Sequence, residues 1–232
     1  MDNRNIANLD EQAISKAQTD FLSKVYAWMV GGLLLTGLTA WYTFTSGIYI
    51  TIISSSMLWV LIIAELGLVM LLVARIDKLS TFSAGAFFLL YSLLNGLTLS
   101  VILAIYTDES IQRVFYTAAG MFGTMSLFGW LTKKDLSGMG RFMFMGLIGI
   151  IIASVVNIFM PISALNFAIS VIGVVVFAGL TAYDTQKLKE MWAVQFDDSA
   201  RATKASILGA LTLYLDFINL FLFLLRIFGG RR

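Results

Sequence analysis

Long uncharged stretches alternate with short charged segments along almost the entire chain. Asp, Glu, Lys and Arg are absent from positions 25–64, 79–107 and 142–183, and the stretch 205–228 carries only Asp216 and Arg226. A charged side chain is costly at the centre of a bilayer, so charges tend to mark the ends of membrane spans. The pattern therefore indicates a chain that crosses a membrane several times.

The uncharged stretches predict seven membrane-spanning helices. A spanning helix needs about 20 mostly apolar residues, so the longest stretches must each contain two helices that are divided at a polar break. The first such break lies at Thr43–Gly47 and the second near Pro161. The predicted spans are, in order, 25–45, 50–74, 79–107, the segment from Arg113 to Thr132, two helices within 142–183, and 205–228.

This division predicts one membrane domain, at 25–228, between a polar cytoplasmic tail at 1–24 and a short basic tail at 229–232. With the N-terminus inside, twelve of the sixteen Lys and Arg residues fall on the inner side of the membrane. The positive-inside rule then makes that side cytoplasmic. The remaining four are Arg113, Arg226, Arg231 and Arg232. A re-entrant last helix would return the basic C-terminus to the cytoplasm, but we predict seven full spans.

Composition supports an all-α integral membrane protein. Hydrophobic residues make up 59% of the chain and charged residues only 13%, which is about half the charged share of an ordinary soluble domain. The spans lack the alternating pattern of a β-barrel, so they satisfy their backbone hydrogen bonds as helices. A net charge of +2, with the basic residues scattered, argues against a nucleic-acid partner.

Catalytic groups are scarce. The chain has no His and no Cys, and the run Ser54–Ser56 has no base near it in the sequence. Nucleophilic and metal-dependent hydrolysis are therefore improbable, and we predict neither an enzyme nor a cofactor. An aspartyl intramembrane protease would also use two membrane aspartates, but the residues around the aspartates of this chain do not resemble that class.

Three carboxylates lie inside predicted spans or at their inner ends: Glu65, Asp184 and Asp216. Such residues usually belong to ion pathways, proton relays or counter-ions. The structural alternative is an ion pair that joins two helices, such as Glu65 with Arg226. Asp216 is the strongest candidate, because polar residues recur with it along one side of its helix. These residues are Ser206, Gly209, Thr212, Asn219 and Arg226.

Asp184 and Asp216 can meet if the sixth helix continues beyond Asp184. Asp216 lies roughly 15 Å along the last helix by helical rise, so Asp184 must lie about as deep. Two carboxylates that share a site of low dielectric cannot both ionise cheaply, and they titrate as a unit. Such a pair would sense pH without histidine. Its oxygen atoms would also suit a hard cation such as calcium.

Four stretches resemble the Bax inhibitor-1 family of small membrane proteins, in its bacterial branch. They begin at Phe21 (FLSKVYAWMVGGLLLTG), Gly146 (GLIGIIIASVVNIF), Phe177 (FAGLTAYDTQKLK) and Leu213 (LYLDFINLFLFLLRIFG). The last two are specific, and together the stretches reach across nearly the whole chain. The resemblance implies a bacterial cytoplasmic membrane protein in which six helices surround the seventh.

The resemblance also implies a pH-sensitive calcium leak that is governed by an aspartate pair, which maps onto Asp184 and Asp216. It implies an arginine latch from the second helix, for which Arg75 is the candidate, and Glu65 with Arg226 is carried over as a second pair. Two alternatives stay open. One is a non-conducting regulator that binds a membrane protease or other quality-control machinery, and the other is a proton-coupled transporter of a small solute.

Overall fold

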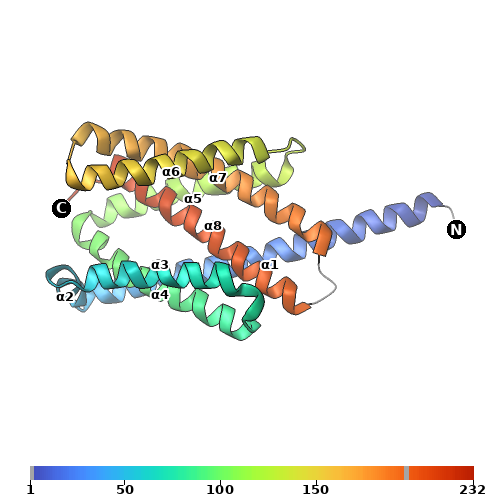
Figure 1. Ribbon diagram of the computed structural model, residues 1–232, viewed down its shortest axis with the longest axis horizontal. Coiled ribbons are helices and arrows are strands. Elements are labelled where there is room, and N and C mark those ends of the chain that lie inside the picture. The colour runs from blue at the N-terminus through green and yellow to red at the C-terminus, as the bar shows by residue number, and fades with distance from the viewer. Residues whose placement is uncertain (1–2, 196–198) are drawn as a thin grey trace.

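The computed structural model describes residues 3–195 and 199–232 as a bundle of long helices joined by short connections (Figure 1). In chain order the elements are α1 (Asn3–Thr45), α2 (Ile48–Ser54), α3 (Met57–Arg75), the 3₁₀ helix η1 (Ile76–Lys78), α4 (Thr81–Ile105), α5 (Asp108–Leu131), α6 (Ser137–Phe159), α7 (Ser163–Gln195) and α8 (Ser199–Phe228). Seven of the described helices are long and apolar enough to cross a membrane. The all-α membrane fold class is thus confirmed.

Two helix boundaries differ from the prediction. Helix α1 continues from the first span back to Asn3, through most of the predicted tail 1–24, because no Pro or Gly interrupts the chain before Gly31. Residues 1–2 of that tail, and residues 196–198, lie outside the described residues. The second predicted span begins at Met57 rather than near residue 50, because the chain becomes extended at Ser55 and sets α2 apart from α3.

Side-chain caps fix the ends of several spans. The Ser80 hydroxyl accepts a hydrogen bond from the Ser83 amide at the start of α4, and Thr107 does the same for Ser110 at the start of α5. At the turn near Pro161, Asn157 accepts from the Ile162 amide at 3.0 Å and donates to Asn166 at 2.8 Å. These bonds satisfy polar groups that would otherwise be left without partners at the helix ends.

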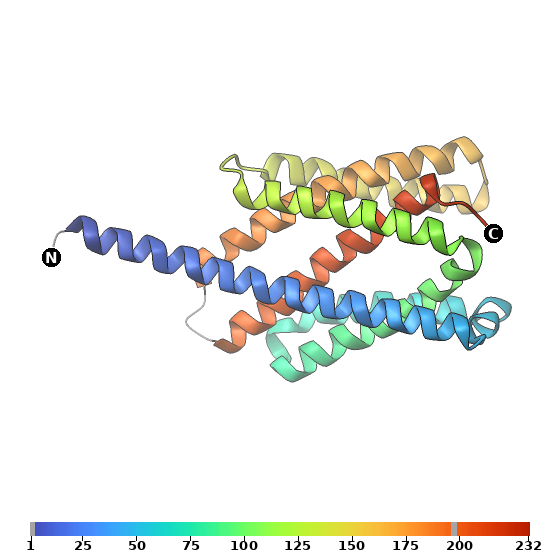
Figure 2. The same cartoon turned by 180° about the vertical axis from the view of Figure 1, so that it is seen from behind.

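Helix α8 crosses the bundle diagonally between two groups of helices. In Figure 1 it passes between the pair α6 and α7 and the pair α3 and α4. In the reverse view of Figure 2, α1 and α5 lie in front of it. It packs against α1, α4, α5 and α7. In the most apolar part of α8, 67% of the residues are buried, whereas in the corresponding part of α6 only 6% are. A polar group on α8 is therefore surrounded mainly by protein, whereas α6 faces mainly lipid.

The C-terminal tail shows that α8 crosses the whole bundle. Gly230 accepts a hydrogen bond from the Thr107 amide at 3.0 Å, and the Arg232 amide donates to Ile105 at 2.9 Å. The Arg232 guanidinium also pairs with Asp108 at 2.5 Å. The tail is thus bound to the α4–α5 connection, at the end of the bundle opposite the α7–α8 connection (Figure 1). The two ends of α8 thus lie at opposite ends of the bundle, as a full span requires.

Candidate functional site

Asp184 and Asp216 come together inside the bundle. Helix α7 continues to Gln195, as a meeting of the two residues requires, and it packs along α8. Their carboxyl groups lie within hydrogen-bonding reach of each other, and both residues line one cavity. Asp216 is 4% exposed, and within the described residues its buried Oδ2 atom has no hydrogen-bond partner. Two carboxyl groups in contact repel each other unless a proton or a cation lies between them.

A cavity of about 1380 Å³ opens beside the aspartate pair. The polar side chains along it include three on α8, namely Thr212, Asp216 and Asn219. This is the polar stripe predicted for the last helix. The stripe does not extend into the cavity as far as predicted, because Gly209 packs against Leu188 and Arg226 is exposed near the end of α8. On the polar side of α8, Gly209 therefore faces α7, whereas Thr212, Asp216 and Asn219 line the cavity.

The residues next to Asp184 hold α7 to three different segments. Thr185 lies 3.0 Å from the Ser126 hydroxyl of α5, which also bonds the Tyr26 hydroxyl of α1. Gln186 accepts from the Leu136 amide and donates to the Lys134 carbonyl, both at 2.8 Å, and so fixes the α5–α6 connection. These contacts give the stretch YDTQ a positioning role that sequence reasoning missed.

Tyr183 also requires a glycine opposite it. A Cβ atom at Gly140 would lie 2.5 Å from the Tyr183 ring, so only glycine lets the start of α6 approach α7 this closely. One turn further along α7, the Lys187 ammonium lies 5.9 Å from the centre of the same ring. Lys187 also acts electrostatically on Asp184. The pair is thus flanked by a basic group toward the end of α7.

The oxygen atoms of the pair suit a hard cation that is held weakly. Calcium takes six to eight oxygen ligands when it is bound firmly. Within the residues that the structure describes, no cluster of three or more acidic, His or Cys side chains could hold a metal. The two carboxylates, with Thr212 and Asn219 beside them on the cavity wall, form a smaller ligand set. Such a set fits a permeant ion better than a resident one.

Glu65 lies apart from the aspartate pair and does not pair with Arg226. Its Oε1 accepts from Thr98 at 2.5 Å and its Oε2 from Asn95 at 3.2 Å, so α4 satisfies both oxygen atoms. The Arg226 guanidinium lies 5.4 Å from the centre of the Phe223 ring instead. Among the described residues the structure forms no Glu65–Arg226 ion pair. Residues of α4 bind Glu65, and Arg226 lies over the ring of Phe223 on its own helix.

Arg75, the candidate for the arginine latch, lies at the exposed end of α3. In the part of the chain that the structure describes, its guanidinium makes no ion pair with either aspartate. It is also absent from the wall of the aspartate cavity, to which α3 contributes Val73. The latch role of Arg75 stays a prediction.

A buried hydrogen-bond chain leads from Glu65 to α8. Asn95, which binds Glu65, accepts from the Tyr214 hydroxyl at 3.1 Å, and that hydroxyl lies 2.7 Å from the Thr36 hydroxyl of α1. The chain joins α3, α4, α8 and α1. Sequence reasoning missed it, although Asn95 in the middle of a long uncharged stretch was a signal.

Comparison with known proteins shows the family to which the chain belongs. The family model described as inhibitor of apoptosis-promoting Bax1 matches residues 18–232. The chain belongs to the Bax inhibitor-1 family. It is 54% identical over 216 residues to the inner membrane protein YbhL of Escherichia coli K12, covering 91% of this chain and 92% of that protein.

Other members of the Bax inhibitor-1 family are similar over nearly their whole length. A Rickettsia prowazekii protein, RP147, is 44% identical over 91% of this chain and 90% of its own. A Deinococcus radiodurans protein is 43% identical over 97% of this chain and 96% of its own. The family assignment therefore covers the complete bundle and both stretches that carry the aspartates.

Proposed function

We propose that this member of the Bax inhibitor-1 family is a pH-sensitive, calcium-permeable leak channel with Asp184 and Asp216 as its sensor and cation site. The observation that carries the proposal is the contact of two carboxyl groups inside the membrane-spanning part of the protein. A shared proton leaves the pair with one net negative charge, and loss of that proton adds a second negative charge, so the pair attracts a cation more strongly. Protons and calcium then compete for one position.

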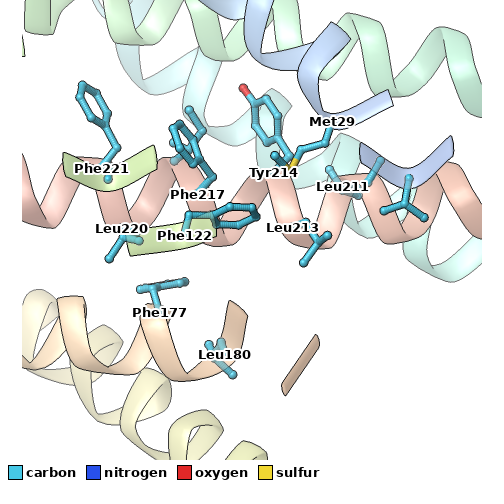
Figure 3. Packing of buried hydrophobic residues seen from close by; sticks show 14 of the residues in the cluster. Met29, Phe122, Phe177, Leu180, Leu211, Leu213, Tyr214, Phe217, Leu220 and Phe221 are labelled. Atoms are coloured by element: carbon cyan, nitrogen blue, oxygen red, sulfur yellow. The ribbon is translucent and has the colours of Figure 1, made fainter. Parts of the chain in front are cut away.

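The packing beyond the pair supports a channel that is closed in this conformation. Toward the C-terminal end of α8, Phe217 packs edge-to-face on Phe122 of α5 with ring centres 5.6 Å apart. Phe223 stacks on Phe177 of α7 at 5.8 Å. Figure 3 shows the apolar layer that these helices form around α8. An ion at the aspartate pair would meet this layer next, so conduction would require the helices to separate there.

Calcium flux into proteoliposomes tests the proposal. We expect flux that rises from about pH 6 to about pH 8, because deprotonation of the pair increases its attraction for the cation. We expect D216N to remove most of this pH dependence, because an amide keeps the shape of the side chain but cannot titrate. The measurement is the initial rate of calcium entry, reported by a dye inside the vesicles.

The matched control is D77N, which removes an exposed carboxylate at the same end of the bundle, on η1, away from the cavity. It should leave the rate and its pH profile unchanged. If D216N behaves like D77N, the mechanism is wrong. If purified wild-type protein conducts no calcium at any pH but co-purifies with a membrane protease, the regulatory role replaces the channel. Saturable solute uptake would favour the transporter.

We further propose that the chain lies in a bacterial cytoplasmic membrane with its N-terminus in the cytoplasm. The support is the unequal distribution of Lys and Arg and the name of the relative YbhL, an inner membrane protein. Because the chain has no cysteine, single cysteines can report the orientation. A membrane-impermeant maleimide should label E109C in intact spheroplasts and K133C only after permeabilisation. The reverse labelling pattern would contradict this orientation and place the N-terminus outside the cytoplasm.

A further inference from the structure

The cavity beside the aspartates opens sideways, toward lipid. Helix α6 packs against α7, whereas α3 packs mainly against α4, and in Figure 1 α8 passes between these two groups. The cavity is lined by residues of α3, α6, α7 and α8. Its wall includes five apolar side chains of α3 and α6, each more than half exposed. They are Val73, Phe142, Phe144, Met145 and Ile151. In a membrane these side chains face acyl chains, so a lipid can reach the polar interior from the side.

The polar groups of the cavity follow one another in a definite order along α7. Asp216 is 4% exposed, and Lys187, which is exposed, follows Asp184 three residues later, which is about 4.5 Å by helical rise. Arg141, near the start of α6, lines the same cavity. The cavity thus offers negative charge inside, positive charge about one helical turn toward the end of the bundle, and apolar walls beside both.

This order matches one kind of membrane lipid. A phospholipid with an ethanolamine headgroup carries an anionic phosphate and, across a two-carbon linker, a primary ammonium with three N–H donors. The phosphate would lie with Lys187 and Arg141. The ammonium would reach the carboxyl pair, which lines the cavity and in which, among the described residues, the Oδ2 of Asp216 has no hydrogen-bond partner. A choline headgroup has no N–H to donate, and a glycerol headgroup has no positive charge.

We propose that this cavity is a binding site for an ethanolamine phospholipid, with its ammonium at Asp184 and Asp216 and its acyl chains along α6 and α3. A proton-sharing pair carries one net negative charge, which one ammonium neutralises. The inference concerns lipid binding at the pair and does not depend on ion conduction. A protein that binds this lipid and passes no calcium would contradict the proposed function and leave the lipid site intact.

Lipid exchange into the full-length purified protein, followed by native mass spectrometry, tests the site. The probes are palmitoyl-oleoyl phosphatidylethanolamine and the matching phosphatidylcholine and phosphatidylglycerol. We expect the ethanolamine lipid to be retained at least about tenfold more strongly than either of the others. We expect D216N and K187Q each to remove most of this preference, because one weakens the ammonium site and the other the phosphate site.

The controls are D77N and K133Q, which change exposed charges outside the cavity wall and should keep the preference. Equal retention of the three lipids would show ordinary surface lipid only and would overturn the proposal. So would a preference that survives in both D216N and K187Q. A thermal unfolding scan of each variant accompanies the binding data. If D216N is not folded, K187Q decides the outcome, because Lys187 lies at the edge of the cavity.

Discussion

Replacing Gly129 by alanine is expected to destabilise the protein severely. Gly129 of α5 lies against the backbone of Ala182 of α7, and a Cβ atom there would lie 2.1 Å from the Ala182 carbonyl oxygen and 3.0 Å from its Cα. Both atoms belong to backbone, so no side chain can rotate away. The two helices must separate, which costs about 1–3 kcal/mol or more of unfolding free energy. The shift would also reach Asp184, two residues along α7.

The measurement is the midpoint of thermal unfolding in lipid nanodiscs. The matched control is G123A, in the same helix, where nothing lies within 4 Å of the added Cβ. That substitution should be neutral or slightly stabilising, because alanine favours the helix. Equal behaviour of G129A and G123A would show that α5 and α7 do not pack this closely.

Replacing Tyr214 by alanine is expected to have the second large effect. The Tyr214 side chain is fully buried on α8, and its ring packs edge-to-face on Phe88 and Tyr91 of α4, with ring centres 6.0 and 5.6 Å away. Truncation leaves a cavity of ring size and removes the hydrogen bonds to Asn95 and Thr36. We expect a loss of about 3–5 kcal/mol in unfolding free energy.

The variant Y214F separates the two contributions, because it keeps the ring and removes only the hydroxyl. We expect Y214F to cost about 1 kcal/mol, the usual size of one hydrogen bond inside a membrane protein. The control is F228A, at the end of the same helix, where the side chain is 65% exposed. The measurement is equilibrium unfolding in mixed micelles. A Y214A variant as stable as F228A would mean that α8 is not held by α1 and α4 at this position.

The number and the order of the spans could be read from the sequence, because a bilayer penalises charge and unsatisfied backbone wherever they occur along the chain. Arg75, Asp77 and Lys78 therefore mark the end of the second span correctly. Hydropathy does not report where a helix begins when polar residues with good helix propensity precede its apolar part. In α1 the helix therefore starts well before the predicted span. Hydropathy also could not separate α2 from α3, since apolar residues lie on both sides of Ser55.

The candidate site was predicted in part. The depth of Asp216 and its polar stripe pointed to a buried functional carboxylate. The helical rise pointed to Asp184 as its partner if the sixth helix continued, and the resemblance to the Bax inhibitor-1 family implied the same pair. The Glu65–Arg226 pair fails in the structure for a local reason. Asn95 and Thr98 lie opposite Glu65 on α4 and donate to both of its oxygen atoms, so the carboxylate needs no distant cation. Which side chains of two packed helices face each other depends on how each helix is rotated about its axis and shifted along it. A single sequence does not specify either quantity.

By itself, then, the sequence determined that Asp216 lies inside a membrane-spanning helix and that Asp184 lies at the inner end of another, because long apolar stretches adjoin both residues. Only the tertiary structure decided that the two carboxyl groups touch, that α3 and α6 leave a sideways opening to them, and that the Arg232 tail closes on Asp108 at the far end. These features depend on how closely neighbouring helices approach each other. That distance is set by single residues such as Gly129 and Gly140, whose role appears only against the helix opposite.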